Sequence, residues 1–114
     1  MTQIEQLLKN GADANTKDHK GFSLLMKFAK EGDIPSMRAL LAYGARINDR
    51  DYFSYSALDY AIIEGHLDVV KFLLEDGAKI SHDSYMLAVR QNMKHIVHYF
   101  DSLDQEKQIF IKKK

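Results

Sequence analysis

The residues best suited to metal chemistry are two histidines near the C-terminal end of the chain. His95 and His98 lie three residues apart, and Asp101 lies three residues further on. On a helix this spacing places all three side chains on one face, where they could ligate a metal ion. A metal site normally also needs a further ligand and residues that orient the ligands, and the sequence offers no candidate for either. We therefore favour a solvated helix face, and a metal-binding protein using His95 and His98 is the less favoured alternative.

Paired carboxylates for general acid–base catalysis are the other chemistry to consider, and the candidates are Asp59, Glu64, Asp68 and Asp83. Nothing in the sequence around them predicts a cleft or a shifted pKa, so we expect surface charges. No glycine-rich loop of the GxGxxG or P-loop type is present to hold a phosphate. The chain has no cysteine, which excludes disulfides and thiolate metal ligands. The sequence thus predicts no catalytic residue, no cofactor and no metal, and hence a protein that is not an enzyme.

The composition is that of one small globular domain. The chain has 114 residues, of which 46% are hydrophobic and 28% are charged. A formal net charge of zero argues against binding to nucleic acid or to an anionic membrane. No apolar run is long enough to span a bilayer, and the first ten residues lack the core of a signal peptide. We expect a cytoplasmic protein that is a monomer when free and has no nucleic-acid or membrane partner.

The elements that must position any functional residue repeat along the chain. The segment Ala61–Ala78 reads AIIEGHLDVVKFLLEDGA and contains two apolar helical stretches that meet at Gly65 and His66. The second stretch has the spacing of a helix with one buried face, formed by Leu67, Val70, Leu73 and Leu74. An LLxxGA motif closes that stretch, and its glycines recur at a spacing of 33, at Gly11, Gly44 and Gly77.

A period of 33 with this motif resembles the ankyrin repeat. The family's DxxGxTPLHxAA pattern appears as DHKGFSLLMKFA in residues 18–29 and as DYFSYSALDYAI in residues 51–62. The resemblance covers residues 2–101 and implies an all-α fold, an ankyrin-repeat solenoid of stacked helix–turn–helix units with short hairpin loops. Both copies lack the family's Pro and His, and Ser54 replaces the hairpin glycine of the second copy. These departures are expected to weaken the turn and the start of the first helix.

The register divides one domain, residues 1–114, into five parts. Residues 1–15 form an N-terminal half-repeat cap, with Thr2 and Glu5 as a capping box and Ile4, Leu7 and Leu8 as its apolar side. Full repeats follow at 16–48, where Asp33 and Pro35 start the second helix, and at 49–81.

The last unit, residues 82–101, is shortened. Aligning residues 88–92 on residues 61–65 gives an offset of 27 residues instead of 33, so six residues are missing before this unit. These six residues would have formed the hairpin, and without them we expect the chain to enter the helix directly at Ser81–Ser84. Asp101 falls where Leu41 and Leu74 occur, and a charge at this core position predicts the end of the stack. Residues 102–114 are expected to be a C-terminal cap and tail. Ser102 would start a short helix, Leu103, Ile109 and Phe110 would cover the last interface, and Lys112–Lys114 would be solvated.

Some distinctive side chains are expected to be structural. His66 lies in the Gly-His corner that the family shares, where its imidazole can bind backbone groups of a neighbouring loop. The methionines Met26, Met37, Met86 and Met93 fall at or near core-facing positions, and we expect them to fill the core.

The resemblance implies a function in protein–protein interaction. In this family the hairpin tips and the exposed positions of the first helix form a concave surface that faces the partner. Carried over by register, and with two flanking residues of the second repeat, the expected partner-binding residues are His19, Lys20, Phe22, Lys30, Tyr52, Phe53, Tyr55, Asp59, Tyr60, Ile63, Glu64, Arg90 and Gln91.

The aromatic residues of the second hairpin are the most informative of these. A turn normally favours Gly, Asn, Asp or Ser, whereas Tyr52, Phe53 and Tyr55 surround Ser54. Aromatic residues are enriched at interface centres, so we predict that they bind a partner protein, although one or two could instead pack on the neighbouring repeat. An inhibitor or immunity protein is the favoured specific role. The alternatives are a scaffold fragment of a longer ankyrin array and the metal-binding protein considered above.

Overall fold

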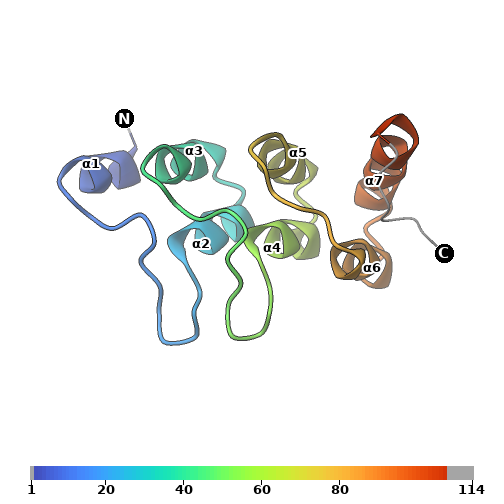
Figure 1. Cartoon of the computed structure of the whole chain (residues 1–114), viewed down its shortest axis with the longest axis horizontal. Coiled ribbons are helices and arrows are strands. Elements are labelled where there is room, and N and C mark those ends of the chain that lie inside the picture. Colours follow the sequence, from blue (N-terminus) through green and yellow to red (C-terminus); the bar gives the residue numbers. More distant parts are fainter. Residues whose placement is uncertain (1, 108–114) are drawn as a thin grey trace.

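The computed structural model describes residues 2–107, with side chains as far as residue 103. This part of the chain forms seven α-helices and no β-strand, within an envelope of 47 × 27 × 20 Å. The helices lie in two rows (Figure 1). The outer row contains α1 (Gln3–Lys9), α3 (Ile34–Ala42), α5 (Leu67–Glu75) and α7 (Lys94–Lys107), and the inner row contains α2 (Leu24–Glu31), α4 (Ala57–Glu64) and α6 (His82–Arg90). The all-α solenoid of stacked helix pairs is confirmed.

Each inner helix begins at a serine because its hydroxyl satisfies a free N–H of the first helical turn. Ser23, Ser56 and Ser81 accept hydrogen bonds from the N–H groups three residues ahead. The outer helices α1 and α3 begin as expected, with a capping box at Thr2 and a cap at Asp33. The cap residues alone therefore position most of the helix starts.

The corners between paired helices need a left-handed backbone. Gly32 and Gly65 end α2 and α4 with φ values of 79° and 75°. A Cβ on Gly32 would lie 3.3 Å from the ring of His66, so the corner also needs the small size of glycine. Asn92 takes φ 58° at the equivalent place after α6, which supports the 27-residue offset of the shortened unit.

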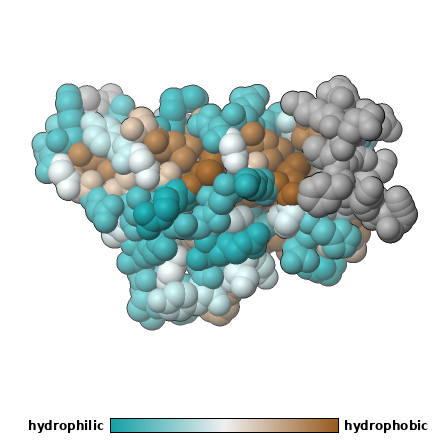
Figure 2. Space-filling model, viewed as in Figure 1, coloured by the Kyte–Doolittle hydropathy of each residue, from teal (hydrophilic) through white to brown (hydrophobic). Residues whose placement is uncertain are grey.

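The core runs between the two rows. Its largest fully buried side chains include those of Leu25, Met26, Met37, Leu40, Leu58, Ile62, Val69, Val70, Leu73, Ile96 and Phe100. In the view of Figure 2, hydrophobic residues run along the middle of the molecule, and the hairpins below are mostly hydrophilic to neutral, with a small hydrophobic patch at their lower end. Met26 and Met37 fill the core as expected, whereas Met86 and Met93 are only half-buried.

The buried face of two outer helices differs from the sequence prediction. In α5, Val70 and Leu73 are fully buried, but Leu67 and Leu74 are half-buried, and Val69 and Phe72 take part in the core instead. The reason is that α5 packs on α4 below it and on α7 beside it, so its buried surface is wider than one stripe. In α1 the expected core residue Leu7 is exposed, because α1 packs mainly on α3 and its opposite side faces solvent.

Asparagine side chains tie the loop of each repeat to the next. The amide of Asn15 donates to the carbonyl of Gly44 at 3.1 Å, and its oxygen accepts from the N–H of Arg46 at 2.9 Å. Asn48 forms the same pair of bonds with the loop of Gly77, at 3.4 Å to the Gly77 carbonyl and 3.0 Å from the N–H of Lys79. These bonds join the loops that follow the outer helices α1, α3 and α5.

The C-terminal unit differs from the prediction in one respect. The helix α7 continues without a break to Lys107, so the separate short helix expected at Ser102 is wrong. The Ser102 hydroxyl donates to the carbonyl of Tyr99 at 2.7 Å inside the helix and caps nothing. Asp101 is half-buried, and its carboxylate accepts from the Tyr85 hydroxyl at 2.9 Å. The expected positions of Ile109, Phe110 and Lys112–Lys114 lie outside the described residues.

Candidate protein-binding surface

Two hairpins project from the inner row, and an aspartate shapes each of them. Asp18 accepts hydrogen bonds from the N–H groups of Lys20 and Phe22 at 2.8 and 3.0 Å. Asp51 repeats this arrangement 33 residues later, accepting from Phe53 and Tyr55 at 2.9 and 3.0 Å. The two backbone hydrogen bonds also lower the pKa of Asp18 below its usual value. Both turns are therefore fixed before any partner arrives.

The second hairpin packs directly on the first. The N–H of Tyr52 donates to the carbonyl of Lys20 at 2.9 Å. The Tyr52 ring lies on Gly21, where a Cβ would come within 3.0 Å of a ring carbon. At the equivalent position of the second hairpin, Ser54 takes the left-handed conformation with φ 69°. The turn shape is thus kept without glycine, at a backbone cost of about 1 kcal/mol.

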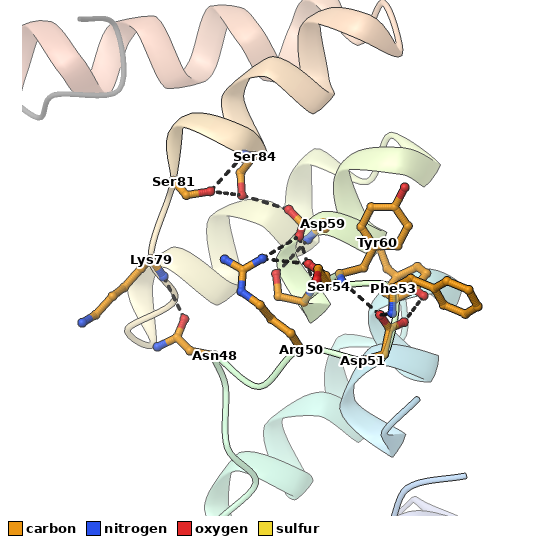
Figure 3. Close-up of polar contacts among 12 residues, drawn as sticks. Asn48, Arg50, Asp51, Phe53, Ser54, Asp59, Tyr60, Lys79, Ser81 and Ser84 are labelled. Carbon is orange, nitrogen blue, oxygen red and sulfur yellow. Dashed lines mark hydrogen bonds and ion pairs between the residues drawn. The ribbon is translucent and has the colours of Figure 1, made fainter. Parts of the chain in front are cut away.

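Three of the predicted aromatic residues pack on one another. The rings of Phe22 and Tyr55 both meet Tyr60 edge-on, with centroids 5.3 and 5.6 Å from its ring centroid. The Tyr60 hydroxyl donates to the buried carboxylate of Asp51 (Figure 3). Burial of Tyr60 raises the pKa of its hydroxyl, and the hydrogen bond to Asp51 raises it further. This cluster supports the base of the second hairpin from inside.

The other two aromatic side chains of the hairpin extend into solvent. Tyr52 is 77% exposed and Phe53 is 60% exposed, although both belong to residue types that normally bury much of their surface. Tyr55 is at the boundary between half-buried and exposed. We call residues 52–55 the aromatic tip. It combines a fixed backbone with exposed aromatic area, which is the property expected of an interface centre.

Asp59 is not a surface charge, which corrects the sequence prediction. Its side chain is only 4% exposed, and its carboxylate accepts from the N–H of Ser56 at 3.1 Å and from the Ser84 hydroxyl at 2.9 Å. The Arg50 guanidinium lies 3.8 Å away (Figure 3). In the first repeat the Met26 sulfur takes the same place and accepts from the N–H of Ser23 at 3.3 Å. Asp59 therefore joins α4 to α6, and its carboxylate is already hydrogen-bonded within the fold.

Two hollows flank the pair of hairpins. The larger, of ≈ 720 Å³, lies against the first hairpin and α2, and Phe22, Lys27 and Lys30 are among its lining residues. The smaller, of ≈ 190 Å³, lies between the second hairpin and α6. We call the smaller one the hairpin slot. It is lined by Arg50, Phe53, Ser54, Tyr55, Asp59, Asp83, Leu87 and Arg90.

The remaining predicted residues are distributed around these features. Six of them are exposed, namely His19, Lys20, Lys30, Glu64, Arg90 and Gln91, and Ile63 is half-buried. Arg50 was missed, although it lines the hairpin slot. The 33-residue register could have found it, because it stands where Lys17 flanks the first hairpin.

The histidines connect neighbouring helix corners. The Nε2 atom of His66 lies 3.0 Å from the Lys30 carbonyl, which confirms the structural role expected for this residue. His95 was expected to be solvated only; it is exposed, but its Nε2 lies 3.0 Å from the Gly65 carbonyl. Among the described residues no group of three or more His, Cys, Asp or Glu could hold a metal ion. His98, exposed on α7, is therefore not part of such a group.

A rigid stack of helix–turn–helix repeats that presents hairpin loops on one side defines a solenoid protein of the repeat class. The family model described as "Ankyrin repeats (3 copies)" matches residues 2–84. The chain belongs to the ankyrin-repeat family, whose repeats are generally protein–protein interaction modules and typically non-enzymatic. A search of the curated proteins found no match. None of the helices in residues 2–107 combines the length and apolar character needed to cross a membrane.

Proposed function

We propose that this chain binds a partner protein through the aromatic tip and the charged residues beside it. The observation that carries the proposal is the exposure of Tyr52 and Phe53 on a hairpin held by Asp51. Aromatic side chains bury much area while losing few rotatable bonds. Because hydrogen bonds already order the backbone, binding needs little further ordering, which favours affinity.

The surroundings of the aromatic tip suit a protein interface. Exposed charges of both signs lie on the first hairpin, at Lys20, and along the inner helices, at Lys30, Glu64 and Arg90, and can form the polar rim that such interfaces have. Tyr60 supports the tip from beneath and is not expected to contact the partner over much of its surface. The binding residues we propose are therefore fewer than the sequence predicted, since Asp59 is excluded.

The specific role we propose is that of an inhibitor or immunity protein in the cytoplasm. A single projecting aromatic tip on a rigid base can cover one functional surface of a partner. Within residues 2–107 the first hairpin has no equivalent exposed aromatic residue, since Phe22 is half-buried, and this favours one binding site over the several that a scaffold needs. The absence of cysteine is compatible with a reducing compartment.

Capture of the partner from a native extract tests the proposal. The double variant Tyr52→Ala with Phe53→Ala should retain the far-UV circular dichroism of the wild type and lose the captured protein. Tyr43→Ala is the matched control, because Tyr43 is 49% exposed at the end of α3, outside both hairpins. Equal capture by the wild type and the folded double variant would refute the proposal, as would equal loss with Tyr43→Ala.

A further inference from the structure

The row of hairpins ends on an open side. The first hairpin contributes one acceptor to the second, because the Lys20 carbonyl accepts a hydrogen bond from the N–H of Tyr52 at 2.9 Å. The equivalent acceptor of the second hairpin is the carbonyl of Phe53, since 20 plus 33 is 53. No hydrogen-bond donor within the described part of the chain reaches it. The six residues that would have formed a third hairpin are missing from the sequence, and Ser81 leads directly into α6.

The hairpin slot lies on this open side. Its walls come from the second hairpin, through Phe53 and Ser54, and from α6, through Leu87 and Arg90. The turn of Ser54 has φ 69°, close to the 78° of Gly21, so the surface on which a third hairpin would rest keeps the shape of the first turn. The slot thus lies where a third hairpin would pack on the second, in the same way that the second hairpin packs on the first.

The charges of the slot are balanced. Arg50 donates to the Ser54 carbonyl at 2.8 Å and lies 3.8 Å from Asp59, so its charge is already used within the fold. Asp83 and Arg90 remain at the rim, one of each sign, and neither forms an ion pair within the described residues. Such a site favours a main-chain segment over a strongly charged ligand.

We propose that the hairpin slot binds an extended loop of the partner protein in place of a third hairpin. The main-chain N–H of an aromatic residue in that loop donates to the Phe53 carbonyl, and its ring lies on the turn of Ser54, as Tyr52 does on Lys20 and Gly21. Main-chain pairing of this kind supplies affinity, and the pocket for the side chain supplies specificity. The proposal rests on the proposed function, because the loop belongs to the same partner.

A second copy of the chain does not fit this slot. Its first hairpin offers the equivalent N–H at His19, but α2 follows that hairpin directly at Leu24. If the first hairpin of a second copy entered the slot, the α2 helix of that copy would have to pack on α4. The helix α6 of the first copy already packs there (Figure 1). The occupant must therefore be a loop that does not continue into an inner helix.

A cyclic peptide that copies residues 50–56 is the probe, because this hairpin already makes the proposed contact on the first repeat. Nitrogen-15 NMR spectra of the full chain should show the largest shifts at the backbone amides of Ser54, Tyr55 and Arg90. A peptide methylated on the nitrogen of the residue that copies Tyr52 should bind about tenfold more weakly, because it has no N–H to donate. Absence of binding at about 1 mM peptide, or equal binding of both peptides, would overturn the proposal.

Asp83→Trp blocks the slot without changing the aromatic tip, and His82→Trp is the matched control. Both residues are exposed in the first turn of α6, but only Asp83 lines the slot. Asp83→Trp should weaken peptide binding about tenfold or more and His82→Trp less than about twofold, with melting temperatures recorded for both. Equal effects of the two variants, shifts confined to the first hairpin, or shifts that depend only on protein concentration would each overturn the proposal.

The same pair of variants separates the two proposals in partner capture. If Tyr52→Ala with Phe53→Ala abolishes capture and Asp83→Trp does not, the slot proposal fails and the proposed function stands. If the double variant captures the partner normally, the proposed function itself fails, whatever the peptide does.

Discussion

Replacing Asp51 by alanine should be the most damaging single change in the hairpins. One carboxylate oxygen accepts the N–H groups of Phe53 and Tyr55, and the other accepts the Tyr60 hydroxyl. Asp51 is only 6% exposed, so water cannot fully replace these bonds. Asp51→Ala therefore removes three hydrogen bonds to a carboxylate at once. The N–H groups of Phe53 and Tyr55 and the Tyr60 hydroxyl each lose their acceptor.

The expected loss follows from the environment of these donors. Hydrogen bonds to charged groups contribute about 1.5–3 kcal/mol each, and a buried donor left unsatisfied costs about 1–3 kcal/mol. The hairpin is on the surface and Tyr60 is half-buried, so the freed donors regain part of their hydration. We expect a total loss of about 2–4 kcal/mol in the free energy of unfolding, out of about 5–15 kcal/mol for a typical domain. The melting temperature should fall by about 10 °C.

Urea unfolding followed by circular dichroism measures this loss, and the repeat supplies its own control. Asp18 makes the same two backbone bonds in the first hairpin but is exposed and has no tyrosine partner among the described residues, so Asp18→Ala should cost clearly less. Tyr60→Phe removes the third bond alone and should cost about 1–2 kcal/mol. A loss below about 1 kcal/mol for Asp51→Ala, or equal losses at both aspartates, would refute the reasoning.

Three further predictions concern the stack and its turns. Leu73→Ala, at a fully buried position, should cost about 2–5 kcal/mol by leaving a cavity, and a melting shift of only about a degree would show that the core tolerates the change. Ser54→Gly should stabilise the protein by about 0.5 kcal/mol, because relief of the left-handed backbone strain outweighs the greater flexibility of glycine in the unfolded chain. Gly65→Ala should destabilise the protein, because φ is 75° at this residue and the new Cβ would lie 3.3 Å from the Met93 sulfur. The raised pKa of Tyr60 means that its protonated form is favoured in the folded state, so its contribution to stability is complete below about pH 10 and is lost as the pH rises above that value. Unfolding free energies measured between neutral pH and about pH 11 should therefore fall less steeply for Tyr60→Phe than for the wild type, and parallel curves would contradict this assignment.

The helices and their order could be predicted because they depend on neighbouring residues. The 33-residue spacing of LLxxGA, the caps at Thr2 and Asp33, and the corner at Gly65 involve groups within one or two turns of each other. The shortened last unit was predicted from a 27-residue offset alone, and the left-handed Asn92 at the place of Gly65 supports that offset. Local chemistry is sufficient for these features.

The burial of individual side chains depends on which residues of other repeats lie opposite them. The sequence around Asp59 indicates a surface carboxylate, and it is the Ser84 hydroxyl, 25 residues later on α6, that gives this carboxylate a buried partner. His95 has an outward register position, yet it reaches the Gly65 carbonyl of the preceding corner. Such contacts could not be predicted from the sequence, because the residues that form them lie 25 to 30 positions apart in the chain.

The two hairpin aspartates show most clearly which features depend on the local sequence and which depend on tertiary packing. The sequence alone determined that Asp18 and Asp51 would each begin a hairpin, because their carboxylates bind N–H groups two and four residues ahead. Only the tertiary structure decided that one is exposed and the other buried. Tyr60 packs over Asp51, whereas the equivalent position of the first repeat holds Lys27, whose long charged side chain remains in solvent. Local hydrogen bonds set the shape of each turn, and side-chain packing from the neighbouring helices sets what each turn exposes to a partner.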